Sequence, residues 1–292
     1  MPRAFDLALT SLAPIVWGST YVVTTELLPE GYPLTAAVLR ALPAGLLLLL
    51  LTRKLPSGRW ILRSLILGVL NFSIFWWLLF VAAYKLPGGV AATVGALQPL
   101  FVLYLARLLL DQTINPLAVL AGIGGVLGVA FLVIGPSAAL SPIGLIAAIG
   151  GAASMALGIV LSRKWQPPVS PLTFTSWQLT AGGVVLLPFA YWSEPALPTL
   201  DTGAWVGFGY LGLVGGALTY ILWFRGIARL GPSSVAPLGL MSPVAATILG
   251  WLILGQALTP LQSVGMVLVL VSVWAGPRAQ QKLLAAEHAQ GS

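Results

Sequence analysis

The chain has 292 residues, of which 58% are hydrophobic and only 7% are charged. Soluble domains carry roughly 25% charged residues, so water is excluded as the main solvent of this chain. The mean hydropathy of +0.98 also indicates a membrane protein without a separate soluble domain. Because the chain has no cysteine, disulfide bonds and thiolate chemistry are excluded as well.

Apolar stretches long enough to cross a bilayer follow one another along almost the whole chain. A membrane-spanning helix needs about 20 mostly apolar residues, and clusters of charged residues, glycine and proline separate such stretches here. We predict ten spans, at residues 7–28, 34–52, 62–84, 88–110, 116–135, 141–162, 172–192, 203–225, 232–254 and 260–276. The predicted fold class is therefore an all-α integral membrane protein with ten transmembrane helices. The first stretch is longer than a signal peptide, so we expect it to be retained.

The distribution of basic residues predicts how these spans are oriented. Ten spans place both termini on one side of the membrane. If that side is the cytoplasm, most of the 14 basic residues lie in cytoplasmic loops or helix ends, namely Arg3, Arg53, Lys54, Arg59, Arg63, Arg107, Arg163, Lys164, Arg225, Arg229, Arg278 and Lys282. This asymmetry follows the positive-inside rule. It predicts a multi-pass protein of the cytoplasmic (inner) membrane with both termini cytoplasmic. The net charge of +7 then reflects topology, and no nucleic-acid partner is expected.

The two halves of the chain resemble each other in sequence. A shift of 144 residues aligns Pro99 with Pro243, Gln112 with Gln256 and Pro116 with Pro260, and a shift of 138 residues aligns Pro33 with Pro171. Each half would hold five spans, and an odd number makes the two halves enter the membrane in opposite senses. The sequence therefore predicts two inverted five-helix repeats, at 1–136 and 137–277, followed by a polar cytoplasmic tail at 278–292.

These features resemble the drug/metabolite transporter superfamily, specifically its ten-helix EamA type. The residues that carry the resemblance are Trp17-Gly18-Ser19, Pro33, Arg40, the stretch from Tyr84 through Gln98-Pro99 to Asp111-Gln112 and Pro116, and a second copy from Ala228 through Ser242-Pro243 to Gly255-Gln256 and Pro260. The resemblance implies a central cavity lined by the first four helices of each repeat, with the fifth helix at the periphery. Within the superfamily the chain looks most like the YddG-type exporters of aromatic and other neutral amino acids. It departs from the family pattern at Gly255, where an acidic residue is usual.

Polar and aromatic side chains recur on single faces of several predicted spans. Isolated polar groups are costly in lipid, so such faces are candidates for a cavity wall. The candidate substrate-binding residues are Trp17, Thr20, Tyr21, Ser73, Trp76, Trp77, Phe80, Tyr84, Gln98, Trp177, Tyr220 and Trp223. They predict an apolar, aromatic pocket with scattered hydroxyl groups, which suits the uncharged side chain and zwitterionic backbone of a neutral amino acid. The alternative is that the aromatic residues anchor at the membrane interface and the hydroxyl groups bond to their own helices.

Two prolines and one arginine inside predicted spans are further candidates. Pro99 and Pro243 each free a backbone carbonyl within a helix, and we predict that they act as gating hinges, with a merely structural kink as the alternative. Arg40 lies in the outer half of the second predicted span and is a candidate contact for a substrate carboxylate. Pairing with Glu26 or Glu30, or snorkelling of the side chain to the surface, stays open.

No acidic residue lies midway along any predicted span. A carboxylate proton relay needs an acid at depth, so we expect gradient-driven export without one, and Glu26 and Asp111 are the alternatives for coupling. A multidrug exporter of lipophilic cations is the second hypothesis, because aromatic faces attract cations. A carrier of phosphates or nucleotide sugars would need several basic residues in the cavity, and an enzyme would need a catalytic set that the sequence lacks. We expect no enzymatic activity, no metal and no cofactor, and a monomer in the lipid bilayer with a small-molecule substrate.

Overall fold

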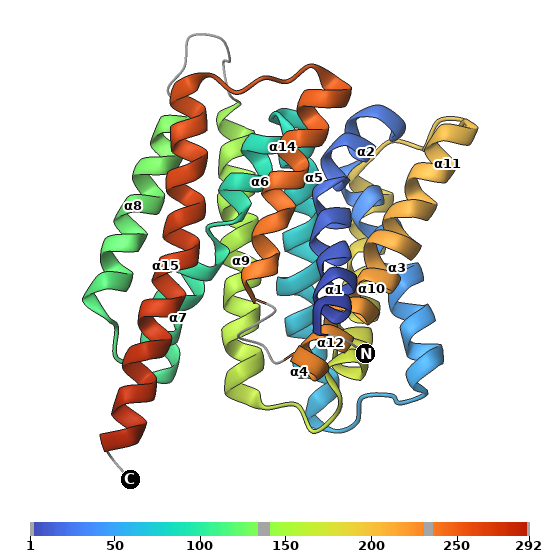
Figure 1. Cartoon of the computed structure of the whole chain (residues 1–292). Helices are drawn as coiled ribbons and strands as arrows, with labels where there is room; N and C mark the ends of the chain where they lie inside the picture. Colours follow the sequence, from blue (N-terminus) through green and yellow to red (C-terminus); the bar gives the residue numbers. More distant parts are fainter. Residues whose placement is uncertain (1–2, 134–140, 231–235, 291–292) are drawn as a thin grey trace.

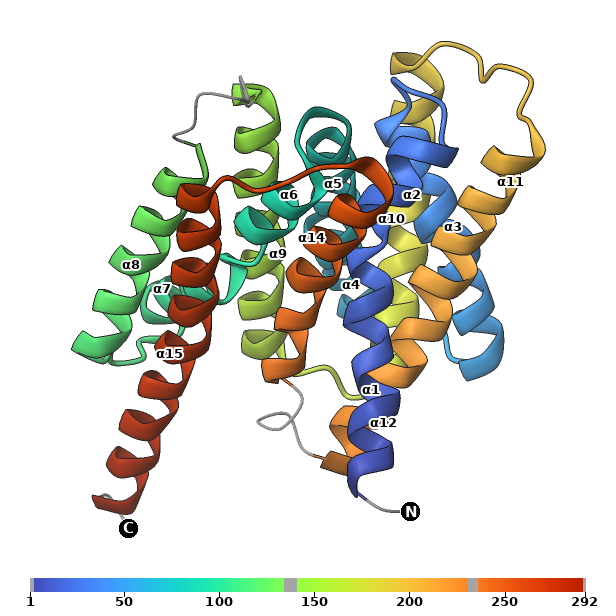
Figure 2. The ribbon, with the colours of Figure 1, turned by 45° about the horizontal axis from the view of Figure 1, so that its top comes forward.

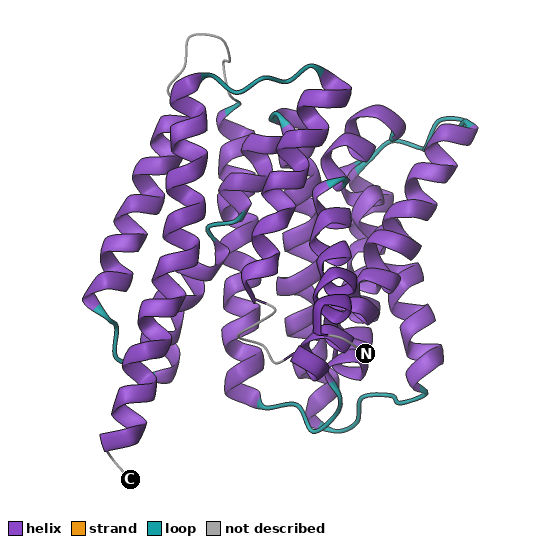
Figure 3. Ribbon diagram, viewed as in Figure 1, coloured by secondary structure: helices purple, strands orange, loops and turns teal. Residues whose placement is uncertain are grey.

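The structure, a computed structural model, describes residues 3–133, 141–230 and 236–290, which form a bundle of helices with no strand among them (Figures 1 and 3). The first half contains α1 (Arg3–Gly18), α2 (Thr20–Leu27), α3 (Pro33–Thr52), α4 (Arg59–Gly68), η1 (Val69–Ile74), α5 (Phe75–Lys85), α6 (Gly88–Gly95), α7 (Gln98–Leu110) and α8 (Pro116–Val133). The second half contains α9 (Pro142–Trp165), α10 (Pro171–Ser193), α11 (Thr202–Gly209), η2 (Tyr210–Leu218), α12 (Thr219–Leu230), η3 (Ala236–Leu240), α14 (Met241–Leu254) and α15 (Pro260–Gln290).

Helical segments occupy all ten predicted ranges, apart from 134–135 and 232–235, which lie outside the described residues. By length and composition, six of these segments can cross a membrane, and three further apolar segments are shorter. Several helices begin where the sequence favours a start. Proline is the first residue of α3, α9 and α10, and the side chains of Ser141 and Ser170 accept hydrogen bonds from the first turns of α9 and α10. The described part of the chain is thus all-helical, and several of its helices are long and apolar enough to cross a membrane.

The last helix differs from its predicted extent. We predicted that the tenth span ends at residue 276, but α15 continues to Gln290. The residues after Pro277 are mostly alanine, glutamine, leucine and lysine, which have high helix propensity. The helix therefore extends beyond its apolar part, Pro260–Gly276, and its far portion protrudes from the bundle in Figure 1.

Both prolines predicted as hinges lie in the first turn of a helix that follows an interruption. The helix α6 ends at Gly95, and α7 begins with Gln98 and Pro99. Pro243 lies in the first turn of α14, directly after the 3-10 segment η3. A proline has no N–H to donate to the preceding turn. Before Pro99 the helix stops at residues 96–97, and before Pro243 a 3-10 segment interrupts the α-helical geometry and leads directly into α14.

Helices α7 and α14 end in the same backbone conformation. Asp111 and Gly255, their C-cap residues, are both left-handed, with φ of 52° and 63°. The next residue, Gln256, donates its N–H back to the carbonyl of Gly250 at 3.0 Å. Glycine adopts this conformation without strain, so Gly255 is suited to this helix end.

The start of α1, the end of α15 and the α3–α4 and α9–α10 loops lie at one end of the bundle, which we call the terminal end; the opposite end is the far end (Figure 1). Helices α8 and α15 pack against each other along one side of the bundle, where a Cβ atom at Gly128 would lie 2.7 Å from the carbonyl oxygen of Gly265. Helix α3 packs along α10, and α1 packs along α12. The second packing brings the candidate residues of the first and eighth predicted spans together.

Candidate substrate-binding site

Six aromatic side chains from both halves of the chain meet beside α1. We call Trp17, Phe72, Trp76, Tyr220, Trp223 and Phe224 the aromatic cluster. The ring centroids are 5.9 Å apart for Trp17–Tyr220, 5.2 Å for Trp17–Trp223, 5.1 Å for Phe72–Trp76, 5.9 Å for Phe72–Tyr220 and 6.1 Å for Tyr220–Phe224. These are favourable spacings for aromatic pairs. Four of the six residues, Trp17, Trp76, Tyr220 and Trp223, were predicted as substrate-binding residues.

Hydroxyl groups hold the edge of the aromatic cluster in place. The indole Nε1 of Trp17 donates to Oγ1 of Thr219 at 2.9 Å, and that hydroxyl donates to the carbonyl of Gly215 at 2.8 Å. Two residues after Trp17, between α1 and α2, the hydroxyl group of Ser19 is 2.7 Å from that of Tyr210. These hydrogen bonds link the first span to the helix formed by η2 and α12.

Arg40 is buried next to this cluster, with 3% of its surface exposed. Its Nη1 donates to Oγ1 of Thr20 at 3.0 Å, and its Nη2 donates to the carbonyl of Gly215 at 3.4 Å. Its guanidinium carbon is 4.7 Å from the ring centroid of Trp76, a cation–π distance. Of the possibilities left open for Arg40, the structure shows neither pairing with Glu26 or Glu30 nor snorkelling to the surface. Helix α3 packs face to face against η2 and places the arginine inside the bundle.

Helix periodicity and a local change of helix type create this arrangement. Thr10, Trp17, Thr20 and Thr24 recur at intervals of three, four or seven residues, so they share one face of the first span. The η2 segment is a π-helix and contains Gly215 and Gly216. In a π-helix the backbone hydrogen bonds run from i to i+5, and the small glycines let α3 approach its carbonyl groups closely. The carbonyl of Gly215 is thereby available to Arg40.

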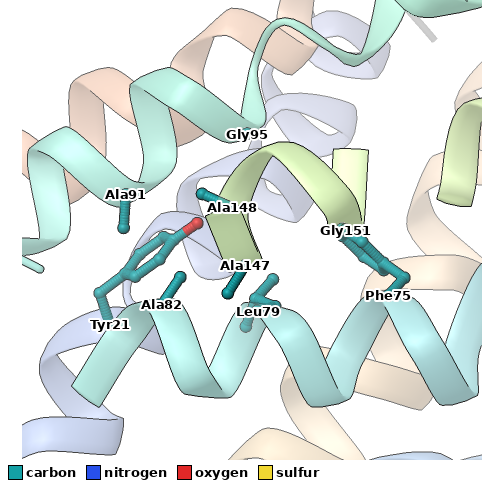
Figure 4. Close-up of a pocket in the computed structure, with 9 residues that line it drawn as sticks. All are labelled: Tyr21, Phe75, Leu79, Ala82, Ala91, Gly95, Ala147, Ala148 and Gly151. Carbon is teal, nitrogen blue, oxygen red and sulfur yellow. The ribbon is translucent and has the colours of Figure 1, made fainter. Parts of the chain in front are cut away.

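A small pocket lies beside Tyr21 (Figure 4). Its lining residues come from α2, α5, α6 and α9 and are almost all apolar: Tyr21, Phe75, Leu79, Ala82, Ala91, Gly95, Ala147, Ala148 and Gly151. The hydroxyl oxygen of Tyr21 points toward Ala148 in Figure 4. Tyr21 therefore lines an almost wholly apolar space.

Trp177 lies apart from the aromatic cluster. It belongs to a separate buried group with Trp60, Leu67 and Phe174, and its Nε1 donates to the carbonyl of Lys54 at 2.6 Å. Because α10 starts at the terminal end, Trp177 is only two turns from that end and meets the α3–α4 loop. The sequence placed this tryptophan in the cavity wall together with Trp17, and the structure does not bring them together.

The other predicted residues occupy varied surroundings. Ser73 donates to the carbonyl of Gly182 on α10 at 2.9 Å, and the Tyr84 hydroxyl donates to the carbonyl of Pro29 at 2.9 Å. Phe80 is fully buried in the same core group as Trp76. Trp77 is 39% exposed, because consecutive residues of a helix point in different directions. Gln98 is half-buried at the start of α7.

Sequence reasoning missed several residues that the fold places here. Phe72, Tyr210 and Phe224 belong to the site but were not selected from the sequence. For the two phenylalanines the reason is that an isolated phenylalanine in an apolar span carries no signal. Asp6 was also missed. It accepts hydrogen bonds from Arg225 at 2.7 Å and Arg229 at 3.4 Å, joining α1 to α12 at the terminal end (Figure 2). The polar face of the first span, extended by one turn from Thr10, would have included it.

The sequence profile of the EamA-like transporter family matches residues 5–134 and again residues 142–275. The chain belongs to the EamA-like transporter family. Protein PecM of Dickeya dadantii is 44% identical to this EamA-like chain over 88% of it and 87% of PecM. The uncharacterized inner membrane transporter YedA of Escherichia coli K12 is 31% identical, over 89% of the chain and 86% of YedA.

Two more distant comparisons concern a curated relative and a solved structure. A probable amino-acid metabolite efflux pump of Salmonella typhimurium is 27% identical, over 92% of this chain and 93% of that protein. A solved crystal structure superposes with a TM-score of 0.67 at 18% identity, over 97% of this chain and 99% of that chain, and shows the fold. The EamA-like chain is therefore a membrane transporter of the drug/metabolite transporter superfamily.

Proposed function

We propose that this transporter exports aromatic and other neutral amino acids through the space around the aromatic cluster. The observation that carries the proposal is the cluster itself, where rings from α1, η1, α5 and α12 meet beside hydroxyl groups and one buried arginine. Aromatic faces and small hydroxyls suit an apolar side chain, and Arg40 is the candidate contact for the carboxylate. The similarity to a probable amino-acid metabolite efflux pump supports the substrate class.

We propose further that two inverted five-helix repeats alternate access to this site, with both termini in the cytoplasm. Corresponding features support this: α8 and α15 both begin with proline, and the π-helical segments η1 and η2 overlap after a shift of 144 residues. The family profile matches each half separately. The interruptions before Pro99 and Pro243 supply hinge points in corresponding helices. Two similar halves of opposite orientation can exchange conformations around one site.

A flux assay in proteoliposomes tests the substrate class. The purified full chain is reconstituted and offered a panel of neutral amino acids, lipophilic cations and sugar phosphates, with and without pH and voltage gradients. Saturable flux of neutral amino acids, aromatic ones above all, is the expected result. Flux of lipophilic cations alone would contradict the proposal and favour a multidrug exporter, for which the aromatic faces also provide an attraction.

A matched pair of tryptophan variants tests the site. Trp17→Ala removes a ring that contacts two others in the aromatic cluster, whereas Trp192→Ala removes a tryptophan that is 79% exposed near the end of α10. We expect Trp17→Ala to lower amino-acid flux by up to about tenfold, since an aromatic contact is worth roughly 0.5–1.5 kcal/mol beyond its buried area. Trp192→Ala should transport normally. Equal effects of the two substitutions on flux would contradict the proposal that the aromatic cluster binds the substrate.

Coupling is proposed to need no carboxylate relay inside the membrane. Glu26 and Asp111 are both exposed and lie at helix ends. Flux that scales with an imposed pH gradient, and that Glu26→Gln or Asp111→Asn abolishes, would contradict this part of the proposal.

A further inference from the structure

Arg40 is a buried cation whose contacts provide no counter-charge. Its neighbours are a hydroxyl on Thr20, the carbonyl of Gly215 and the face of Trp76. A hydroxyl, a carbonyl and an indole ring carry no charge. Its Nε, also buried, has no hydrogen-bond partner in the described residues. The N–H of Nε is therefore left for another acceptor.

The chain has seven acidic residues, Asp6, Glu26, Glu30, Asp111, Glu194, Asp201 and Glu287, and the six whose side chains the structure describes are paired elsewhere or exposed. Asp6 pairs with two arginines, and Asp201 accepts from the first turn of α11. Glu194 accepts hydrogen bonds from the first turn of α3. Glu26, Glu30 and Asp111 are exposed, and Glu287 is in the final turns of α15. The segments outside the described residues contain no Asp or Glu.

An unpaired charge inside a membrane protein costs free energy, and such charges typically mark substrate or ion pathways. Arginine is well suited to bind a carboxylate, because its planar fork of N–H donors matches the two oxygens. The hydroxyl of Thr20 and the ring of Trp76 hold the guanidinium in one orientation without neutralising it. Arg40 is thus prepared for an anionic group that the protein itself does not supply.

We propose that the substrate supplies the counter-charge of Arg40, so that this site selects aromatic monocarboxylates whether or not they carry an α-amino group. The inference rests on the proposed transport function and refines its substrate class. A substrate ammonium group would find no carboxylate near Arg40 within the described part of the chain, and the arginine would repel it. The carboxylate is therefore the required group and the amino group is dispensable. The same charge disfavours lipophilic cations.

Three small molecules of similar size separate these requirements. L-Phenylalanine carries both charged groups, 3-phenylpropionate carries only the carboxylate, and 2-phenylethylamine carries only the ammonium group. Binding of each to the purified full chain is measured by calorimetry in lipid nanodiscs. We expect 3-phenylpropionate to bind within about threefold of phenylalanine and 2-phenylethylamine to bind at least tenfold more weakly. Equal or tighter binding of 2-phenylethylamine, or no binding of 3-phenylpropionate, would overturn the proposal.

Substitutions then assign the selectivity to Arg40. Arg40→Gln should weaken both carboxylates by at least tenfold and remove their advantage over 2-phenylethylamine, and Arg40→Lys should retain part of it. Arg63→Gln is the matched control, because Arg63 also lies over tryptophan rings, at 5.1 Å from Trp60 and 5.2 Å from Trp165, within a different group of side chains. An unchanged order of affinities in Arg40→Gln would contradict the assignment. If Arg40→Gln does not fold, the order of affinities for the three compounds in the wild-type chain and in Arg40→Lys tests the assignment.

The outcomes separate this inference from the proposed function. Arg40-dependent binding of 3-phenylpropionate without any amino-acid flux would retain the inference and overturn amino-acid export. Amino-acid flux that does not depend on Arg40 would overturn the inference alone. If none of the three compounds binds, both are overturned.

Discussion

Among the residues that the structure describes, two charged ones, Asp6 and Arg40, are buried, and their surroundings differ. Asp6, at the terminal end of α1, has two arginine partners on α12. Arg40, in the middle of the bundle, has only neutral partners. Both are more than nine-tenths buried. Asp6 therefore has counter-charges and Arg40 has none among the described side chains. The other acidic side chains that the structure describes accept hydrogen bonds from other helices or are exposed.

The comparison suggests a division between structural and ligand-binding charges. Removing one partner from a satisfied ion pair leaves an uncompensated charge and destabilises the fold. Removing an unpaired charge relieves a desolvation cost and can leave stability unchanged or raise it. Stability and transport should therefore respond in opposite ways to substitutions at the two sites.

The largest effect is expected for Arg40→Leu, on transport. Loss of a charge-assisted contact with the carboxylate removes about 1.5–3 kcal/mol, so flux of phenylalanine in proteoliposomes should fall by about tenfold to a hundredfold. The thermal unfolding midpoint should stay the same or rise. A variant that keeps full transport, or one that unfolds at a much lower temperature, would place Arg40 among the structural charges.

Asp6→Ala should have the next largest effect, and on stability. The Asp6 side chain is 10% exposed and those of Arg225 and Arg229 are 26% and 49% exposed, so the pair lies between buried and surface ion pairs. We expect a loss of about 1–2 kcal/mol, measured as a lower unfolding midpoint. Adding Arg225→Leu should restore part of it, because the uncompensated cation is removed. An unchanged unfolding midpoint in Asp6→Ala would show that the ion pairs between α1 and α12 do not contribute to stability.

The sequence predicted the location of the helices well, because length and hydropathy decide which segments enter a membrane. It also selected Trp17, Tyr220 and Trp223, which share helical faces with polar neighbours. It did not predict the surroundings of Arg40. Its hydrogen-bond partners are 20 and 175 residues away, and the second depends on a π-helix that no simple residue pattern announces.

The pairing of Asp6 with Arg225 could not be predicted from the sequence either, because the two residues are 219 positions apart. The positive-inside pattern put Arg225 and Arg229 at a membrane boundary, where single charges normally contact water or lipid headgroups. Only the packing of α1 along α12 turns them into partners. Periodicity thus specifies which face of a helix is buried, whereas the partner of that face depends on tertiary packing.

Thr20→Val tests how the unpaired arginine is held. The substitution removes the oxygen that accepts from Nη1 of Arg40 at 3.0 Å while keeping a similar volume. One hydrogen bond to a charged group is worth about 1.5 kcal/mol, so the affinity for 3-phenylpropionate should fall by about tenfold or somewhat less. Thr20→Ser keeps the oxygen and is the control. If the valine and serine variants bind equally well, Arg40 is oriented by Trp76 and Gly215 instead.

Gly215→Ala should have the smallest effect on stability and on ligand affinity. A Cβ atom at this position would lie 3.8 Å from Nη2 of Arg40 and 3.7 Å from the carbonyl of Tyr210, which are ordinary contact distances. The carbonyl that accepts from Arg40 stays in place, and glycine to alanine within a helix gains up to about 1 kcal/mol from backbone entropy. Stability should hold or rise slightly, and the affinity for 3-phenylpropionate should change by less than about twofold. Gly216→Ala is the contrasting variant, because its Cβ would come within 2.9 Å of Cβ of Ala44 and push α3 away from η2. If Gly215→Ala weakens binding as much as Gly216→Ala does, the ligand approaches the guanidinium from the η2 side, and the free Nε is not the group that it meets.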